Sequence, residues 1–490
     1  MSQRLRPLEV ALLAEESLAT PKHNATVEIL EPGDSGFDYD RLLELIGDRI
    51  AFVPRYRQRL QHVPGGLANP RWIDDPDFDL RFHVRRSALP RPGNLEQLRE
   101  LVARIVSRPL DRSKPLWEMY LVEGLSGGRL ALLSKSHQVL VDGVETVDLG
   151  QVLLDSTPSP KLLGADDWRP HRPPSPAGVV LDAVADSLAH PDVLRDTVRS
   201  TGNSLVRQAT RARRSTRRAV VGFTRGRTER SGSMAAPHSQ QRRVVSVLTQ
   251  LDSYRRIRDV HGGTVNDVIL ATITGGLRGW LLTHDESLRG YRQVRAVVPV
   301  SVIDRELQAT SLGSQIAPHF VDLPVGETSP VVRLHQVSYS FQAHKETGRG
   351  VAANRLAGIA GFAPTTFHAI GARVAAEQNR GDFQLMVTNV PGPQSPLYAA
   401  GAEMTATYPV PPLLPGHAVA VGVTSYNGTV AYGITADGAR VPDAEVLGQC
   451  IAEALDELLD TVTEVRPRVP RGRRRPKAVA RAADDAGGRA

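Results

Sequence analysis

The order of apolar and polar residues predicts a chain in which strands and helices alternate. Short apolar or alternating runs predict strands at residues 24–30, 82–84, 117–123, 129–135, 244–248, 294–300, 316–323, 383–387, 419–425 and 429–435. Apolar residues three and four positions apart predict helices at residues 38–53, 94–107, 144–155, 177–218, 251–260, 264–282 and 442–465. Residues 327–376 are also mainly helical in pattern, with breaks at Gly348 and Gly350. This mixture is typical of an α/β (α+β) protein.

Breaks in the pattern divide the chain into segments. A Pro-rich stretch at residues 156–176 is typical of a linker, and an Arg-rich helical stretch follows it. We therefore expect a first domain at residues 1–160, a linker at 161–240, a second domain at 241–465 and a disordered basic tail at 466–490. Asn427-Gly428, between the last two predicted strands, indicates a tight hairpin in the second domain.

Composition fits a globular protein with a sizeable core. The 490 residues are 41% hydrophobic and 23% charged. Cys450 is the single cysteine, so no internal disulfide can form, which suits a reducing compartment. The first residues lack the pattern of a signal peptide, and no apolar window is long enough to span a bilayer. We expect a cytoplasmic protein, either free or at a membrane surface.

The positive charge is concentrated in two segments. Residues 195–230 and 466–490 carry net charges of +9 and +7, so with +7 overall the rest of the chain carries −9. A basic amphipathic helix is suited to an anionic membrane or a lipid droplet, although a solvated linker face is the simpler explanation. Nucleic acid is a less favoured partner, because only Phe223 interleaves with the arginines.

One stretch combines a strand, a turn and a helix around a histidine. It contains His137-Gln138, three apolar residues and then Asp142-Gly143. Other short motifs follow in a fixed order along the chain: Pro115-Leu116-Trp117, Asn266-Asp267, Val298-Pro299-Val300-Ser301 and Asn389-Val390-Pro391-Gly392-Pro393.

These segments resemble the His-His-x-x-x-Asp-Gly signature and companion motifs of the bacterial wax ester synthase/acyl-CoA:diacylglycerol acyltransferase family. The resemblance covers about residues 1–160 and 240–465, and the opening residues from Arg4 to His23 are also similar to the family's. It implies two chloramphenicol-acetyltransferase-like domains in tandem, joined by the long basic linker. It also implies transfer of an acyl group from acyl-CoA to diacylglycerol, and possibly to fatty alcohols, with acyl-CoA as a substrate and no cofactor. A peripheral location at the inner membrane or a lipid droplet would supply the acceptor.

The sequence departs from the signature at the position of the family's general base. His137 takes the place of the first histidine, and Gln138 takes the place of the second. A glutamine amide cannot accept a proton near neutral pH, so His137 becomes the candidate base. Because neighbouring side chains of a strand point to opposite faces, His137 acts as a base only if the backbone turns there or if Gln138 forms a local bulge. The alternative is a structural His137 that is hydrogen-bonded within the core.

Four further residues are candidates for lining the site. Asp142 is a candidate to orient the histidine as in a catalytic triad, but the resemblance implies a mainly structural residue that pairs with an arginine. Gly143 allows the turn. Asn266 and Asp267 open a long predicted helix, either as capping residues or as residues between the domains. No spacing of metal ligands is present.

Two functions follow from these observations. The first is an O-acyltransferase that synthesises triacylglycerol. The second is a catalytically weak or inactive relative that binds lipid surfaces or acyl chains. Residue 138 distinguishes them, because the general-base role is assigned to that position.

Overall fold

The computed structural model describes residues 3–63, 68–140, 149–160, 168–171, 178, 234, 239–284, 293–301, 316–346, 364–378 and 383–463. Most of the expected linker and the whole basic tail lie outside these residues. The expected membrane-binding helix therefore stays a prediction. Within the described part of the chain, no helix is both long enough and apolar enough to cross a membrane.

Strands and helices alternate broadly as the sequence pattern predicts. The strand expected at residues 82–84 is wrong, because residues 80–83 form a short helix and the strand begins at Val84. The strands are β1 (His23–Glu31), β2 (Gln58–Gln61), β3 (Arg71–Asp74), β4 (Val84–Ala88), β5 (Trp117–Glu123), β6 (Leu130–His137), β7 (Arg242–Gln250), β8 (Val294–Ser301), β9 (Ile316–Leu323), β10 (Leu385–Pro391), β11 (Tyr398–Ala399), β12 (Ala402–Val410), β13 (Val419–Tyr426) and β14 (Thr429–Asp437). The α-helices are α1 (Pro7–Glu15), α2 (Tyr39–Arg49), α3 (Leu80–His83), α4 (Leu95–Val106), α5 (Leu149–Leu153), α8 (Leu251–His261), α9 (Val265–Thr283), α10 (Pro330–Glu346), α11 (Pro364–Ala376) and α12 (Ala444–Thr463).

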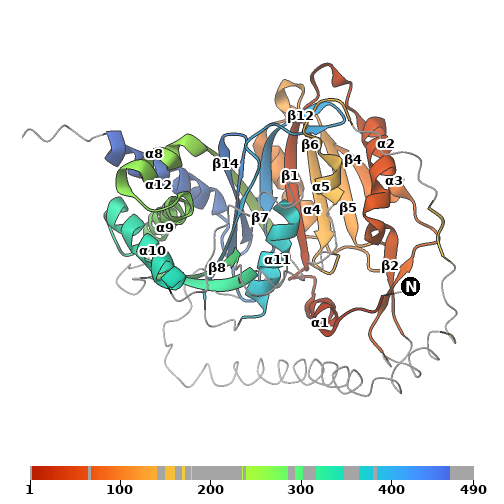
Figure 1. Ribbon diagram of the computed structural model, residues 1–490, viewed down its shortest axis with the longest axis horizontal. Coiled ribbons are helices and arrows are strands. Elements are labelled where there is room, and N and C mark those ends of the chain that lie inside the picture. The colour runs from red at the N-terminus through yellow and green to blue at the C-terminus, as the bar shows by residue number, and fades with distance from the viewer. Residues whose placement is uncertain are drawn as a thin grey trace, which may run out of the picture.

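Two six-stranded sheets form the body of the protein (Figure 1). The first sheet has the order β11-β12-β1-β6-β5-β4, and the second has the order β7-β14-β13-β10-β8-β9. The hairpin expected at Asn427-Gly428 joins β13 to β14. The expectation of a mixed α/β protein with two related halves is confirmed.

The first sheet contains two strands from the second half of the chain, β11 and β12. Strand β12 pairs antiparallel with β1, from Ala25 opposite Val410 to Glu31 opposite Glu403. Our sequence analysis does not predict this strand, although polar and apolar residues alternate through Ala402–Val410. The domain boundaries at residues 160 and 241 stay a prediction. Because β12 belongs to the first sheet, no single point in the sequence separates the residues of the two sheets.

Helices cover the sheets, and several of them have a defined start. Helix α4 begins at Asn94, whose side chain accepts a hydrogen bond from the Gln97 amide. Helix α9 begins with a capping box between Thr264 and Asp267. Helices α8, α9, α10 and α12 pack on the side of the second sheet that faces away from the first, whereas α11 lies between the two sheets (Figure 1).

The two sheets meet where β12 passes β13 and β14. Pro409 lies against two glycines: a Cβ at Gly422 would lie 3.0 Å from Pro409 Cβ, and a Cβ at Gly433 would collide with the Pro409 carbonyl oxygen. Gly433 pairs with Ser246 of β7 and Gly422 of β13, so it cannot move without disturbing both ladders. Small residues therefore set the distance between the sheets.

We expect Gly433→Ala to lower the free energy of unfolding by about 3 kcal/mol or more, because overpacking of a backbone contact cannot be relieved by side-chain rotation. Gly47→Ala is the matched control. Gly47 lies inside α2 with nothing within 4 Å of a built Cβ, so that change should stabilise the protein by up to about 1 kcal/mol. Chemical denaturation of both variants measures the difference, and equal stability would contradict the steric account.

Candidate active site

The motif histidine closes β6, and the chain turns directly after it. The His137 amide donates to the Leu116 carbonyl at 3.0 Å, and the Gln138 amide donates to the Lys22 carbonyl at 2.9 Å. The Leu140 amide then bonds back to the His137 carbonyl at 2.9 Å. The backbone therefore turns where the sequence analysis requires a turn, and both motif residues are fixed by strand-to-strand bonds.

The imidazole of His137 is buried, with 1% of its surface exposed. Its Nδ1 accepts a hydrogen bond from the Val139 amide at 3.1 Å. Because an amide can only donate, Nδ1 is unprotonated and the ring proton lies on Nε2. That Nε2 is 3.5 Å from the Glu16 carboxylate, beyond ordinary hydrogen-bond length but within charge contact. In this arrangement His137 stabilises the turn. The Nδ1 lone pair that a base would need is engaged by the Val139 amide.

Glu16 is the centre of a buried network around this ring. Arg112 donates through Nε to Glu16 Oε2 at 2.9 Å, and the Lys22 amide donates to Oε1 at 2.9 Å. Burial alone would raise the pKa of Glu16, but the contact with His137 and the hydrogen bonds from the Lys22 amide and Arg112 together hold that pKa well below its usual range. Glu16 is therefore a carboxylate at neutral pH, and it orients the His137 ring.

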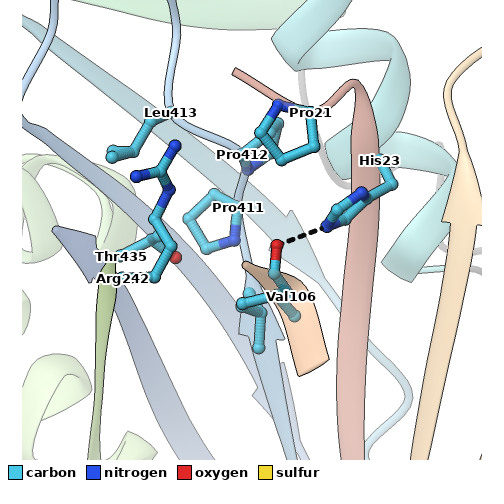
Figure 2. A pocket seen from close by; sticks show the side chains of 9 residues that line it. Pro21, His23, Val106, Arg242, Pro411, Pro412, Leu413 and Thr435 are labelled. Atoms are coloured by element: carbon cyan, nitrogen blue, oxygen red, sulfur yellow. Dashed lines mark hydrogen bonds between the residues drawn. The ribbon is translucent and has the colours of Figure 1, made fainter. Parts of the chain in front are cut away.

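A neighbouring group of buried cationic and imidazole side chains has a structural explanation. His23, which pairs with His137 across the strands, donates from Nε2 to the Val106 carbonyl at 2.9 Å (Figure 2). Lys135 Nζ donates to the Ile105 and Arg108 carbonyls at 3.1 and 2.6 Å. These bonds satisfy the carbonyls at the end of α4. Burial lowers the pKa of Lys135 to about 8.

The cavity beside His23 is too small for a substrate. It measures about 20 Å³ and is closed by Pro21, Val106, Pro411 and Pro412, with Arg242 and Thr435 on its far side (Figure 2). This volume accommodates a single water molecule. We therefore do not assign the active site to it.

Gln138 occupies the position of the expected base, and its side chain is 2% exposed. Its Oε1 is buried and has no hydrogen-bond partner among the described residues. An amide oxygen of this kind can accept a hydrogen bond from a hydroxyl but cannot take the proton away. The residue can therefore hold an alcohol in place without acting as a base.

Asn266 and Asp267 make different contacts at the start of α9, and a place for Asn266 between the domains stays a prediction. Asp267 is buried and completes the capping box, accepting from the Thr264 amide at 2.9 Å. Asn266 Oδ1 instead accepts a hydrogen bond at 2.9 Å from Asn389, which belongs to another of the sequence motifs. Within the described ranges, neither Asn266 nor Asp267 bonds to His137 or Gln138.

The structure leaves part of the predicted site outside the described residues. Asp142 and Gly143 fall in residues 141–148, so their roles stay predictions. Sequence reasoning missed Glu16 and Arg112, which the fold brings to His137. An acidic residue shortly before the Thr20–His23 segment is the available signal, because that segment leads directly into the strand beside the motif.

Comparison with known families matches both halves of the chain. A family model described as wax ester synthase/diacylglycerol acyltransferase catalytic domain matches residues 5–269. A second, described as WS/DGAT C-terminal domain, matches residues 312–459.

Curated relatives are similar over most of the chain. The probable diacylglycerol O-acyltransferase tgs1 of Mycobacterium tuberculosis (strain ATCC 25618 / H37Rv) is 31% identical over 440 residues, covering 86% of this chain and 88% of that protein. The probable diacylglycerol O-acyltransferase tgs3 of the same strain is 42% identical over 260 residues, covering 53% of this chain and 96% of that protein.

Two solved structures share the fold. The wax ester synthase/diacylglycerol acyltransferase from Marinobacter aquaeolei VT8 has a TM-score of 0.65 at 22% identity, covering 94% of this chain and all of that one. The first condensation domain of the calcium-dependent antibiotic synthetase has a TM-score of 0.52 at 14% identity, covering 95% and 97% of the two chains. At these identities the likeness concerns the fold alone, and it confirms the expected two-domain architecture.

Proposed function

Because this chain belongs to the wax ester synthase/diacylglycerol acyltransferase family, we propose that it transfers a long-chain acyl group from acyl-CoA to diacylglycerol. The observation that carries the proposal is the 31% identity over 440 residues to a probable diacylglycerol O-acyltransferase, which spans both halves of the fold. Fatty alcohols are further candidate acceptors.

In the proposed reaction the acceptor hydroxyl oxygen attacks the thioester carbon. The carbon–sulfur bond breaks, the new ester forms, and the hydroxyl proton ends on the thiol of coenzyme A. No acyl-enzyme is needed, because both substrates are held together and proximity lowers the barrier. Cys450 belongs to the distant helix α12.

Residues 137 and 138 divide the roles that two histidines would take. Gln138 Oε1 accepts a hydrogen bond from the acceptor hydroxyl and orients the hydroxyl oxygen for attack. His137 is the candidate base of the sequence analysis, but its Nδ1 is occupied by the Val139 amide and its Nε2 faces Glu16. We therefore propose that His137 positions the turn and that turnover proceeds without a strong base, at a low rate.

The acceptor is insoluble in water, so the enzyme must meet it at a lipid surface. The two basic segments, with net charges of +9 and +7, support contact with an anionic membrane or a lipid droplet on the cytoplasmic side. Nucleic acid is not among the proposed partners.

The test is release of coenzyme A from palmitoyl-CoA by the purified protein, with and without dioleoylglycerol in mixed micelles. We expect release that depends on dioleoylglycerol and appearance of triacylglycerol in equal amount. Release that is independent of the acceptor would indicate a thioesterase, and no release at any protein concentration would overturn the proposal.

A further inference from the structure

One loop of the first half, residues 16–22, supports both motif residues, and we name it the support loop. Glu16, at its start, faces His137 Nε2 at 3.5 Å. The Lys22 carbonyl, at its end, accepts a hydrogen bond from the Gln138 amide at 2.9 Å. The Lys22 amide in turn donates to Glu16 Oε1 at 2.9 Å, which ties the two ends of the loop together. The position of the motif therefore depends on how this loop is held.

The support loop is folded on itself but exposes its tip. The Ser17 and Thr20 hydroxyls share a hydrogen bond at 2.7 Å, and the Thr20 amide donates to the Ser17 carbonyl at 3.0 Å. Leu18, at the tip, is 59% exposed, so apolar packing holds this part of the loop only weakly. Polar contacts from other elements must therefore fix the loop against the rest of the protein.

Two arginines hold the backbone of this region, one from each half of the chain. Arg112, in the first half, donates to the Leu13 carbonyl at 2.7 Å and to the Glu16 carboxylate at 2.9 Å. Arg242, the first residue of β7, donates through Nη2 to the Ala19 carbonyl within the loop. The second half of the chain thus reaches the support loop directly.

The orientation of Arg242 is itself fixed by the second half. Its Nη1 donates to the Ser239 and Gln241 carbonyls at 2.8 and 3.1 Å and lies 3.7 Å from Asp437 Oδ2. Asp437 lies directly opposite Arg242 in the β7–β14 ladder and accepts a hydrogen bond from the Ser239 amide at 2.6 Å. Arg242 is 7% exposed and lines the small cavity that Pro21 also lines (Figure 2). The rigid fork of its guanidinium therefore presents Nη2 to the loop in one orientation.

We propose that Arg242 is a positioning residue for the acyl-transfer motif. Its bond to the Ala19 carbonyl fixes the support loop, and the loop fixes the two motif residues. The geometry of the motif in the first half thereby depends on a side chain of the second half. This inference rests on the proposed function, in which Gln138 orients the acceptor hydroxyl.

The test compares Arg242→Gln with Arg333→Gln. Arg333, in α10, is a matched control because it is 2% exposed, donates to the Glu327 and Thr328 carbonyls at 3.1 and 3.2 Å, and pairs with the Glu457 carboxylate. These contacts all stay in the second half of the chain. We measure the thermal midpoint, kcat and KM for palmitoyl-CoA and dioleoylglycerol, and the side-chain nitrogen NMR signals of His137, assigned with His137→Gln.

Both glutamine variants should have lower thermal midpoints, because each leaves buried partners of a guanidinium unpaired. At a temperature where both are folded, kcat of Arg242→Gln should fall about tenfold with less than about a twofold change in either KM, because a displaced orienting group costs rate rather than binding. The His137 signals should shift in this variant. Arg333→Gln should change neither kcat nor the His137 signals.

A second variant separates positioning from folding if Arg242→Gln is too unstable. Arg242→Lys keeps a positive charge beside Asp437, but a single ammonium cannot span the carbonyls that the planar fork joins. We expect a thermal midpoint close to that of the wild type, together with a lower kcat and shifted His137 signals. Arg333→Lys is its control and should keep the wild-type values of both.

An equal fall in kcat for the Arg242 and Arg333 variants would overturn the assignment. So would wild-type kcat and His137 signals in Arg242→Lys, because the arginine would then contribute to stability alone. The NMR signals keep this inference separate from the proposed function. If the wild type transfers no acyl group but the His137 signals still shift only in the Arg242 variants, the proposed function fails while the coupling between the halves stands.

Discussion

Gln138→His should raise kcat for triacylglycerol formation by about 100-fold. A histidine at this position would provide a base beside the bound hydroxyl, and a positioned base contributes roughly 10²–10⁴-fold to acyl transfer. KM for both substrates should change little, because the larger effect is on the proton transfer in the transition state. Steady-state release of coenzyme A, measured over a range of pH, records the change and the new dependence on an imidazole.

Two further variants identify which residue is responsible. Gln138→Leu keeps the approximate size but cannot accept a hydrogen bond, so turnover should fall below the wild type. A double variant that combines His137→Gln with Gln138→His should be less stable than Gln138→His alone. It should still show the new pH dependence of kcat. If Gln138→His leaves kcat unchanged while His137→Ala abolishes it, then His137 is the base and our interpretation of its geometry is wrong.

Glu16→Gln should lower the free energy of unfolding by about 3 kcal/mol at neutral pH. The change removes the negative charge that faces both Arg112 and His137 in a buried network, and breaking such a pair typically costs roughly 3–5 kcal/mol. Arg112 is partly exposed and can turn to solvent, which places the expected loss at the lower end. Urea denaturation measures the difference.

The effect should depend on pH with a defined sign. The folded pKa of Glu16 is below that of the unfolded chain, near 4.3, so its contribution is complete above that pH and is lost as pH falls toward the folded value. The gap between wild type and Glu16→Gln should therefore shrink below about pH 4. Glu15→Gln is the control, since Glu15 is more exposed and lies 3.8 Å from Lys22. A similar loss in both variants would contradict the central role of Glu16.

Local pattern predicts most elements because their hydrophobic period and end signals agree. Asn94 caps α4, Asn427-Gly428 turns the β13–β14 hairpin, and the apolar run before His137 forms β6. Strand β12 is missing from the sequence-based expectation although its residues alternate, because the Pro-rich segment after it is typical of a turn. Its place beside β1 depends on pairing between opposite ends of the chain, which no local pattern records.

The candidate site is predictable in its position but not in its chemistry. The motif locates His137 and Gln138 at a strand end, and the structure confirms the turn that follows. The partner of His137 is Glu16, which is distant in sequence and reaches the ring only after β1 and β6 pair.

Strand β12 has a consequence for how the protein is made. During synthesis the first sheet lacks β11 and β12 until residue 410 has left the ribosome, so the edge of β1 is open while the second half is being translated. An open edge can pair with another nascent chain. The first sheet, which carries His137, is therefore completed only when β12 pairs with β1. The first half of the protein cannot finish folding until most of the second half has been synthesised.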